Sequence, residues 1–360
     1  MFVWVLLAEY RGGNGNGNRN IMDILVIIIF LIPMTDRVFS LSYGIPDECI
    51  VSEVPKKTRY LAPYIPGAQY QFSHTEEAKY HQMYRDSMFA MTQKKGGWDC
   101  LRHYEILANG CMPIFIGLDK CPVSTLVGFP KKLVLGAMDA LVPWDEKGYE
   151  DYMGRVLAHV RSHVSCSALA ARFLRKMGEK IGGGAAVRKV LMLCGHPGVN
   201  YSRELLWIGL KRVLDAVGGD AGNTGGECAV EYPRMGFLYD DFPLEGASGI
   251  YGKGFTYSRR VDSALKKGEE WNEDRIRASI LAKEWDVVLY GKVGPDELEG
   301  GSMESMPFWG EVSGAYGRDE IAFLYGGDEC QDMTTMNRYS AHLMRHVGHG
   351  ICFVREISTG

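Results

Sequence analysis

This sequence of 360 residues lacks the cysteine spacings that are typical of disulfide scaffolds. The chain has nine cysteines, an odd number, with no Cys-x-x-Cys pair and without the dense spacing of a disulfide scaffold. We therefore expect most of the cysteines to be buried thiols, and we assign no disulfide.

A large excess of charge of one sign is also absent. The sequence has 40 Lys and Arg against 44 Asp and Glu, a net charge of -4, so no global positive field exists to hold nucleic acid. Hydrophobic residues make up 46% of the chain and charged residues 23%, which excludes a disordered chain and a polytopic membrane protein. We expect the bulk of the chain to fold as a globular α/β protein.

The apolar run at residues 24–34 is shorter than the ~20 residues of a spanning helix, and its length is typical of a signal peptide. Val38 and Ser40 fit the small-residue rule for a cut after Ser40. We predict a signal peptide or signal anchor at 1–40, with 1–21 a possible extension ahead of an initiating Met22. This predicts the secretory pathway, Golgi or endoplasmic reticulum lumen, with possible membrane anchoring through 24–34. The alternative is a buried first strand of a cytoplasmic protein.

Strands alternating with helices predict two Rossmann-like domains that face a cleft, because this alternation is typical of parallel sheets with right-handed crossovers. The length also favours two domains. We expect a domain at 41–184, with a helix near 74–87, a strand at 88–92, a helix at 99–109, a strand at 112–117 and helical sequence over 149–180. The Gly182-Gly183-Gly184 run marks the boundary to a second domain at 185–360. Its expected elements are strands at 189–194, 286–290 and 320–325, and helices at 202–217 and 272–283.

A lysine- and glycine-rich loop follows the first predicted strand. Lys94 and Lys95 supply positive charge, and Gly96-Gly97 lets the backbone approach a ligand. Asp99 is a candidate cap of the next helix, whose N-terminal N–H groups favour an anion. The loop predicts a diphosphate site.

Two charged residues follow within this helix, three positions apart. Arg102 offers a forked cationic contact to a diphosphate, and Glu105 offers a carboxylate that accepts both hydroxyls of a ribose. The alternative is an ordinary surface ion pair at i,i+3.

The Ser-Met-Phe sequence at 87–89 and the pattern Arg-x-x-Glu running on to Gly-Cys-Met-Pro at 102–113 resemble the nucleotide-binding half of exostosin-like glycosyltransferases. The likeness covers roughly residues 80–135. It implies a GT-B-like fold and a hexosyl- or pentosyltransferase that uses a nucleotide sugar, with Arg102, Glu105 and Gly110 in the donor half. Asp99-Cys100-Leu101 replaces the serine usual before the arginine, and Ile106 stands in place of an alanine.

The order of the domains differs from that family, because the donor half comes first here. The chain is then either permuted or a compact donor domain followed by an additional domain at 185–360, the expected acceptor side. Two other functions stay open: a glycan-binding protein without catalysis, and another nucleotide-dependent enzyme such as an epimerase. The turn at 195–198 lacks the Gly-x-Gly-x-x-Gly spacing that a dinucleotide-binding epimerase needs.

The general base is sought in the second domain, where His196, Asp240 and Asp241 are candidates. The sequence has no Asp-x-Asp, the spacing that holds a divalent ion on a sugar nucleotide, so we expect metal-independent catalysis and no cofactor. His342, His346 and His349 have a spacing that would also suit zinc, although an exposed helix end is the simpler interpretation. A glycan or glycoprotein is the expected acceptor.

Overall fold

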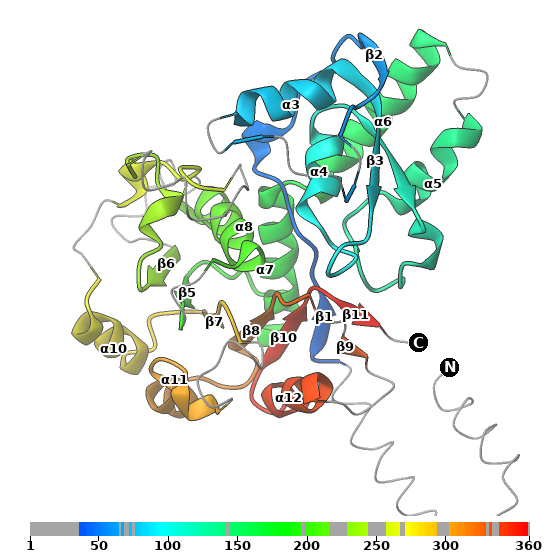
Figure 1. The fold of residues 1–360 in the computed structure, drawn as a ribbon. Coiled ribbons are helices and arrows are strands. Elements are labelled where there is room, and N and C mark those ends of the chain that lie inside the picture. The colour runs from blue at the N-terminus through cyan, green and yellow to red at the C-terminus, as the bar shows by residue number, and fades with distance from the viewer. Residues whose placement is uncertain are drawn as a thin grey trace, which may run out of the picture.

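The computed structural model describes residues 36–64, 66–67, 72–73, 76–140, 145–195, 199–215, 229–243, 257–266, 271–293, 302–328, 331–332 and 338–358. The fold is α/β, with two separate parallel sheets flanked by helices (Figure 1). Across these ranges, none of the helices has the length and apolar character needed to cross a membrane. Residues 1–21, residues 24–34 and His196 lie outside the described ranges, so the targeting segment stays a prediction.

The larger sheet has six parallel strands. Four of the six strands consist of apolar residues that are almost wholly buried, as expected for a parallel sheet covered on both faces. In spatial order the strands are β1 (Val38–Ser40), β10 (Ile351–Val354), β8 (Ile321–Tyr325), β7 (Val287–Tyr290), β5 (Val190–Leu193) and β6 (Ala229–Tyr232).

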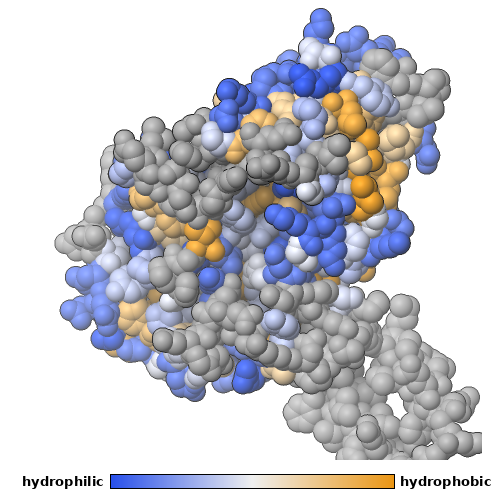
Figure 2. All heavy atoms as spheres, viewed as in Figure 1, coloured by the Kyte–Doolittle hydropathy of each residue, from blue (hydrophilic) through white to orange (hydrophobic). Residues whose placement is uncertain are grey.

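The smaller sheet has three parallel strands, β2 (Arg59–Leu61), β3 (Ser87–Gln93) and β4 (Met112–Ile116). Helix α4 (Leu101–Ala108) connects β3 to β4, which confirms the predicted strand, loop, helix and strand. The other helices of this unit are α3 (Glu77–Asp86), α5 (Lys131–Ala140) and α6 (Glu146–His163). Apolar side chains gather on the surface over this unit (Figure 2), where Ile116, Leu135 and Met138 are among the exposed large hydrophobic residues.

The remaining helices accompany the larger sheet: α7 (Cys166–Gly182), α8 (Tyr201–Leu210), α10 (Glu273–Leu281), α11 (Trp309–Ala315) and α12 (Arg338–Val347). Strands β9 (Gln331–Asp332) and β11 (Ile357–Ser358) form a small parallel pair. Short helical turns occur at Asp47–Cys49, Leu118–Lys120, Lys211–Asp215, Gly236–Leu238, Ser263–Lys266 and Met303–Ser305.

The helical sequence predicted over 149–180 is confirmed but forms two helices, because the chain breaks between α6 and α7. The Ser165 side chain caps α7 by accepting a hydrogen bond from the N–H of Ala168 at 3.1 Å. The backbone of Ile45 bonds to both sides of the break, donating to Val164 O and accepting from Cys166 N, each at 2.9 Å. A segment more than 100 residues away therefore sets this boundary, which local periodicity does not reveal.

The two sheets do not divide the chain at the triple glycine. Strand β1 pairs with β10 in the larger sheet, although it precedes the whole smaller sheet in sequence. Helix α7 also packs on the larger sheet, with the Phe173 and Phe353 rings 4.8 Å apart. Cleavage after Ser40 would remove β1 from this sheet. The stability of a chain that begins at Leu41 therefore tests the predicted cleavage site.

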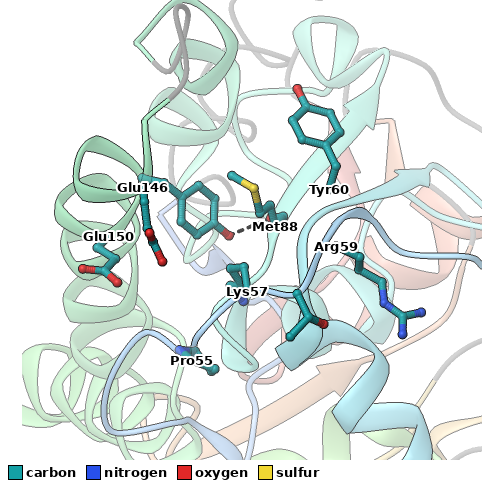
Figure 3. Close-up of a pocket in the computed structure, with 9 residues that line it drawn as sticks. Pro55, Lys57, Arg59, Tyr60, Met88, Glu146 and Glu150 are labelled. Carbon is teal, nitrogen blue, oxygen red and sulfur yellow. Dashed lines mark hydrogen bonds between the residues drawn. The ribbon is translucent and has the colours of Figure 1, made fainter.

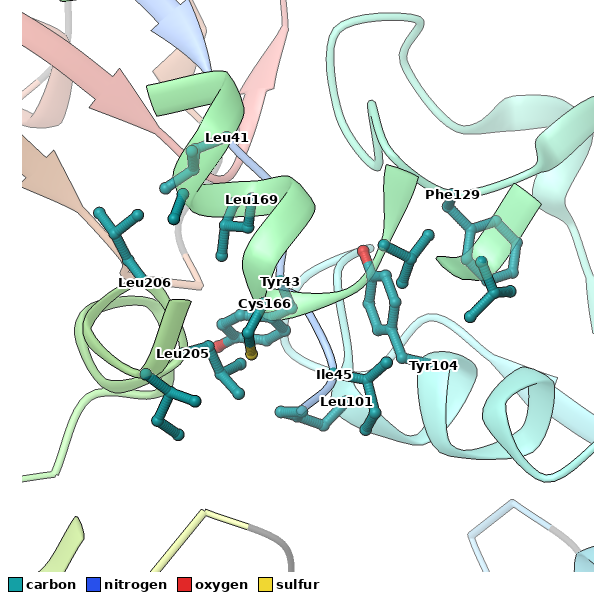
Figure 4. Packing of buried hydrophobic residues seen from close by; sticks show 14 of the residues in the cluster. Leu41, Tyr43, Ile45, Leu101, Tyr104, Phe129, Cys166, Leu169, Leu205 and Leu206 are labelled. Atoms are coloured by element: carbon teal, nitrogen blue, oxygen red, sulfur yellow. The ribbon is translucent and has the colours of Figure 1, made fainter. Parts of the chain in front are cut away.

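One continuous hydrophobic core joins the two sheets. Figure 4 shows the segment with Leu41, Tyr43 and Ile45 running between α7 on one side and Leu101 and Tyr104 of α4 on the other. These side chains are buried, as are Leu205 and Leu206 of α8. The two units are therefore held together by apolar packing as well as by polar contacts.

Close packing of α7 on α8 gives a first prediction. A Cβ on Gly209 would lie 2.0 Å from Cys166 O and 2.9 Å from Ala170 Cβ, so Gly209→Ala must push the helices apart. We expect it to lower the free energy of unfolding by about 3 kcal/mol. Gly154→Ala is the matched control, because Gly154 lies in α6 with nothing within 4 Å. It should raise stability by about 0.5–1 kcal/mol. Urea unfolding followed by circular dichroism measures both, and equal effects of the two variants would contradict the packing described.

Candidate functional site

The carboxyl ends of strands from both sheets meet at the loop that follows β3. A Cβ on Gly96 would lie 2.4 Å from Asp328 Oδ2, and a Cβ on Gly97 would lie 2.2 Å from Glu356 Oε1. Asp328 follows β8 and Glu356 follows β10. Glycine at 97 is therefore needed for the approach of the buried Glu356, whereas the exposed Asp328 side chain could move away from residue 96. The atoms nearest to both glycines belong to carboxylates, which repel a diphosphate.

Arg355 is the centre of this contact and is fully buried. Its guanidinium donates to the carbonyls of Gly326 at 3.0 Å and Gly327 at 2.7 Å, both beyond β8. It also donates to the carbonyl of Asp99 and pairs with Asp328, and it lies 4.6 Å from the centre of the Tyr43 ring. One side chain thus joins the larger sheet to the loop of the smaller one.

Asp99 does not cap α4, so this prediction is wrong. The capping position is Cys100, which makes no side-chain capping bond. The buried carboxylate of Asp99 instead accepts from Tyr43 N at 2.8 Å and from the Tyr104 hydroxyl at 2.6 Å. Burial raises the pKa of Asp99 to about 7, although the Arg355 charge and these two hydrogen bonds lower it.

The raised pKa predicts a pH-dependent stability. The folded chain keeps the Asp99 proton up to about pH 7, whereas an unfolded aspartate loses it near pH ~3.9. The stabilisation that protonated Asp99 gives the folded state is therefore fully present below about pH 4 and is lost as the pH rises through about 7. We expect the urea midpoint of Asp99→Asn, relative to wild type, to rise between pH 5 and pH 8. The exposed Asp139→Asn serves as the control, and a constant difference for Asp99→Asn would contradict the prediction.

Arg102 is the second residue of α4 and is partly exposed. Its guanidinium stacks on the Tyr64 ring at 4.7 Å and donates to the Tyr64 hydroxyl at 3.1 Å. Within the described ranges no carboxylate pairs with Arg102, so the alternative of an ion pair with Glu105 is wrong. The guanidinium keeps donor capacity for an anion.

Glu105 is buried and binds two hydroxyl groups. Oε2 accepts from the Tyr80 hydroxyl at 2.6 Å, and Oε1 accepts from the Tyr257 hydroxyl at 3.1 Å. Tyr80 belongs to α3, whereas Tyr257 comes from the part of the chain that follows β6. Each oxygen of the Glu105 carboxylate is therefore positioned to accept a hydrogen bond from a hydroxyl group.

The other predicted donor-binding residues are divided between the two ends of α4. Lys94 and Lys95 are exposed after β3, with Lys94 Nζ 5.2 Å from the centre of the Trp98 ring. Gly110 lies beyond the opposite end of α4, where its φ is +66° and a Cβ would meet Pro55 Cδ at 2.6 Å. Gly110 thus shapes the turn into β4 and is about 12 Å of helix away from the loop.

The two described candidates for a general base are held in a surface turn. Asp240 accepts from Ser263 N at 3.0 Å, and hydrogen bonds from Ser263 lower its pKa. Asp241 pairs with Lys266 at 2.5 Å. Both are exposed and engaged, which makes them weak bases for an acceptor hydroxyl.

Two of the three histidines of the C-terminal helix face the core. His342 Nε2 contacts Val293 O at 2.8 Å, and His346 Nδ1 contacts the Tyr325 hydroxyl at 2.7 Å. Burial lowers the pKa of His346 to about 4. Among the described residues, no group of three metal-ligating side chains comes together.

Sequence reasoning missed Tyr64, Tyr257, Arg355 and Glu356. The last two had a signal, because charged residues directly after a buried parallel strand lie at the carboxyl edge, where ligands and partner loops bind. The two tyrosines had no such signal in the sequence, because only the tertiary fold brings them to α4. Comparison with protein-family models, curated proteins and solved structures found no match to this chain.

Proposed function

We propose that this chain is a glycosyltransferase that binds a nucleotide-sugar donor at the N-terminal half of α4 and transfers the sugar to a glycan or glycoprotein. One observation carries the proposal. Arg102, with donor capacity to spare, stands one turn from Glu105, a carboxylate that binds two hydroxyls. Both lie on the helix that follows the carboxyl end of β3, the edge at which parallel sheets bind ligands.

Each part of a nucleotide-sugar donor has a matching group in this proposal. The guanidinium of Arg102 and the exposed ammonium groups of Lys94 and Lys95 neutralise the diphosphate, which leaves when the sugar bond breaks. One ribose hydroxyl binds Glu105 by replacing the hydroxyl of Tyr257 at Oε1, while the Tyr80 hydroxyl stays at Oε2. The exchange leaves the number of hydrogen bonds on the carboxylate unchanged.

The arrangement of the sheets supports the GT-B-like part of the proposal. Loops from the carboxyl ends of β3, β8 and β10 contact one another, as expected where two parallel sheets face a shared ligand. Arg355 is paired with Asp328 and Glu356, so it is not available to an anion beside Gly96 and Gly97. Because the two carboxylates repel a diphosphate, we assign the diphosphate to the Arg102 side of the loop.

Ligand-induced thermal stabilisation tests this function. The complete chain is heated with UDP-, GDP- and CMP-sugars, with NAD as the comparison for the epimerase alternative. A ligand at 100 times its Kd adds about 2.7 kcal/mol to the stability of the folded state, enough to raise Tm measurably. We expect one class of nucleotide sugar to raise Tm. No shift with any nucleotide sugar, or a shift with NAD alone, would reject the proposal.

A further inference from the structure

A cavity of about 330 Å³ lies in the smaller-sheet unit, at the end of the strands opposite to α4's N-terminus. Its walls are the segment that leads into β2, the start of β3 and the first turns of α6 (Figure 3). Met88, the second residue of β3, lines it, whereas the lysine loop begins after Gln93 at the other end of that strand. The two sites are therefore about 17 Å apart along β3.

Lys57 supplies hydrogen-bond donors inside this cavity. Its ammonium group donates to the carbonyl of Arg85 at 3.0 Å and lies 5.9 Å from the centre of the Tyr149 ring. No carboxylate of the described residues lies within ion-pair distance of it, so two of its three donors are available to a ligand. Burial lowers the pKa of Lys57 to about 8, which reflects how little of its hydration it keeps.

Acceptors stand on the opposite wall. Glu146 and Glu150 are one turn apart on α6, and neither pairs with a described cation. Figure 3 shows Glu146 and Lys57 reaching the same space from different walls, while the guanidinium of Arg59 points away. A ligand between these walls must accept from one and donate to the other.

Aromatic surface completes the cavity. The Tyr60 side chain is 57% exposed at the rim, and the buried Tyr149 lies behind, its hydroxyl bonded to Met88 O at 2.7 Å. Lys57 is the cation that faces the carboxylates of Glu146 and Glu150, so the cavity has no excess of positive charge to select a phosphate. Its volume is at the lower end for a ligand site, which suits a small unit.

We propose that this cavity binds a neutral sugar unit of a glycan, as a subsite remote from the donor. A hydroxyl group both donates and accepts, so a sugar satisfies Lys57 and Glu146 together, and its apolar face stacks on Tyr60. The inference rests on the proposed function only for the choice of a glycan. The subsite would hold a distant part of an extended acceptor.

Saturation-transfer-difference NMR with the complete chain tests the subsite, using maltotriose, cellotriose, xylotriose and triacetylchitotriose as probes without any nucleotide. We expect at least one trisaccharide to bind and its affinity to fall about tenfold in Lys57→Met, because a hydrogen bond to a charged group is lost. Glu146→Gln, an isosteric change at an exposed residue, should also weaken binding. Lys132→Met, in the exposed surface of α5, is the matched control and should bind as wild type does.

The outcomes separate this inference from the donor proposal. Failure of every trisaccharide to bind, or binding unchanged in both Lys57→Met and Glu146→Gln, would overturn the subsite. Binding of free glycine or lysine in place of the sugars would also overturn it, since the cavity would then take zwitterions. If the subsite fails but a nucleotide sugar still raises the Tm of Lys57→Met, the donor proposal stands. If no nucleotide sugar raises the Tm of wild type but a trisaccharide binds as described, the donor proposal fails and the subsite stands.

Discussion

Arg102→Ala is expected to lower kcat/KM for the nucleotide-sugar donor by at least about 100-fold, because a forked cationic contact to the leaving diphosphate is lost. The measurement is release of nucleoside diphosphate with the donor that raises Tm. Arg155→Ala is the matched control, since Arg155 stacks on Tyr152 at 5.2 Å much as Arg102 stacks on Tyr64, but on α6. Its kinetics should equal those of wild type.

Variants of Glu105 and Tyr257 test the proposed contact to the ribose. Glu105→Gln should weaken donor binding, because an amide offers one acceptor oxygen where the carboxylate offers two. Tyr257→Phe should keep donor affinity or improve it, since the ribose replaces the tyrosine hydroxyl at Oε1 in the proposed complex. Donor affinity within about threefold of wild type in both Arg102→Ala and Glu105→Gln would contradict the assignment of the donor to α4.

Arg355→Met is expected to lower the free energy of unfolding by about 3–5 kcal/mol, because it removes one partner of a buried ionic cluster. The carbonyls of Gly326, Gly327 and Asp99 would lose the Arg355 donor, and so would Glu356 Oε1, which would keep the N–H of Asp99. Urea unfolding measures the loss, with the exposed Arg318→Met as the control.

Hydrogen exchange provides an independent measure of the same cluster. In Arg355→Met, amides of the loop at 94–99 should exchange faster, while those of β5 and β7 at the centre of the larger sheet keep their protection. A variant as stable as wild type, with an unchanged loop, would show that the two sheets are joined by apolar packing alone.

Much of the smaller unit was predictable because its signals are local. The apolar run before Lys94, the amphipathic helix around Arg102 and the Gly-Cys-Met-Pro turn gave β3, α4 and β4 within a few residues. The expected strands at 189–194, 286–290 and 320–325 likewise coincide with β5, β7 and β8. Burial on both faces produces these runs in the sequence itself.

Long-range pairing set the features that the sequence did not reveal. The place of Val38–Ser40 in the larger sheet depends on its pairing with β10, more than 300 residues away. The break after α6 depends on Ile45, and the role of Asp99 depends on Tyr43 and Arg355. The aromatic partners of Arg102 and Glu105, which are Tyr64, Tyr80 and Tyr257, come from three separate segments of the chain, so no local spacing points to them.

Hydrogen–deuterium exchange of the complete chain, with and without the nucleotide sugar that raises Tm, tests the central claim most directly. We predict slower exchange in peptides that cover residues 94–105, because the donor orders the lysine loop and the first turn of α4, with no such change in Arg102→Ala. Protection confined to the cavity around Lys57, or to α12, with residues 94–105 unaffected, would contradict the account.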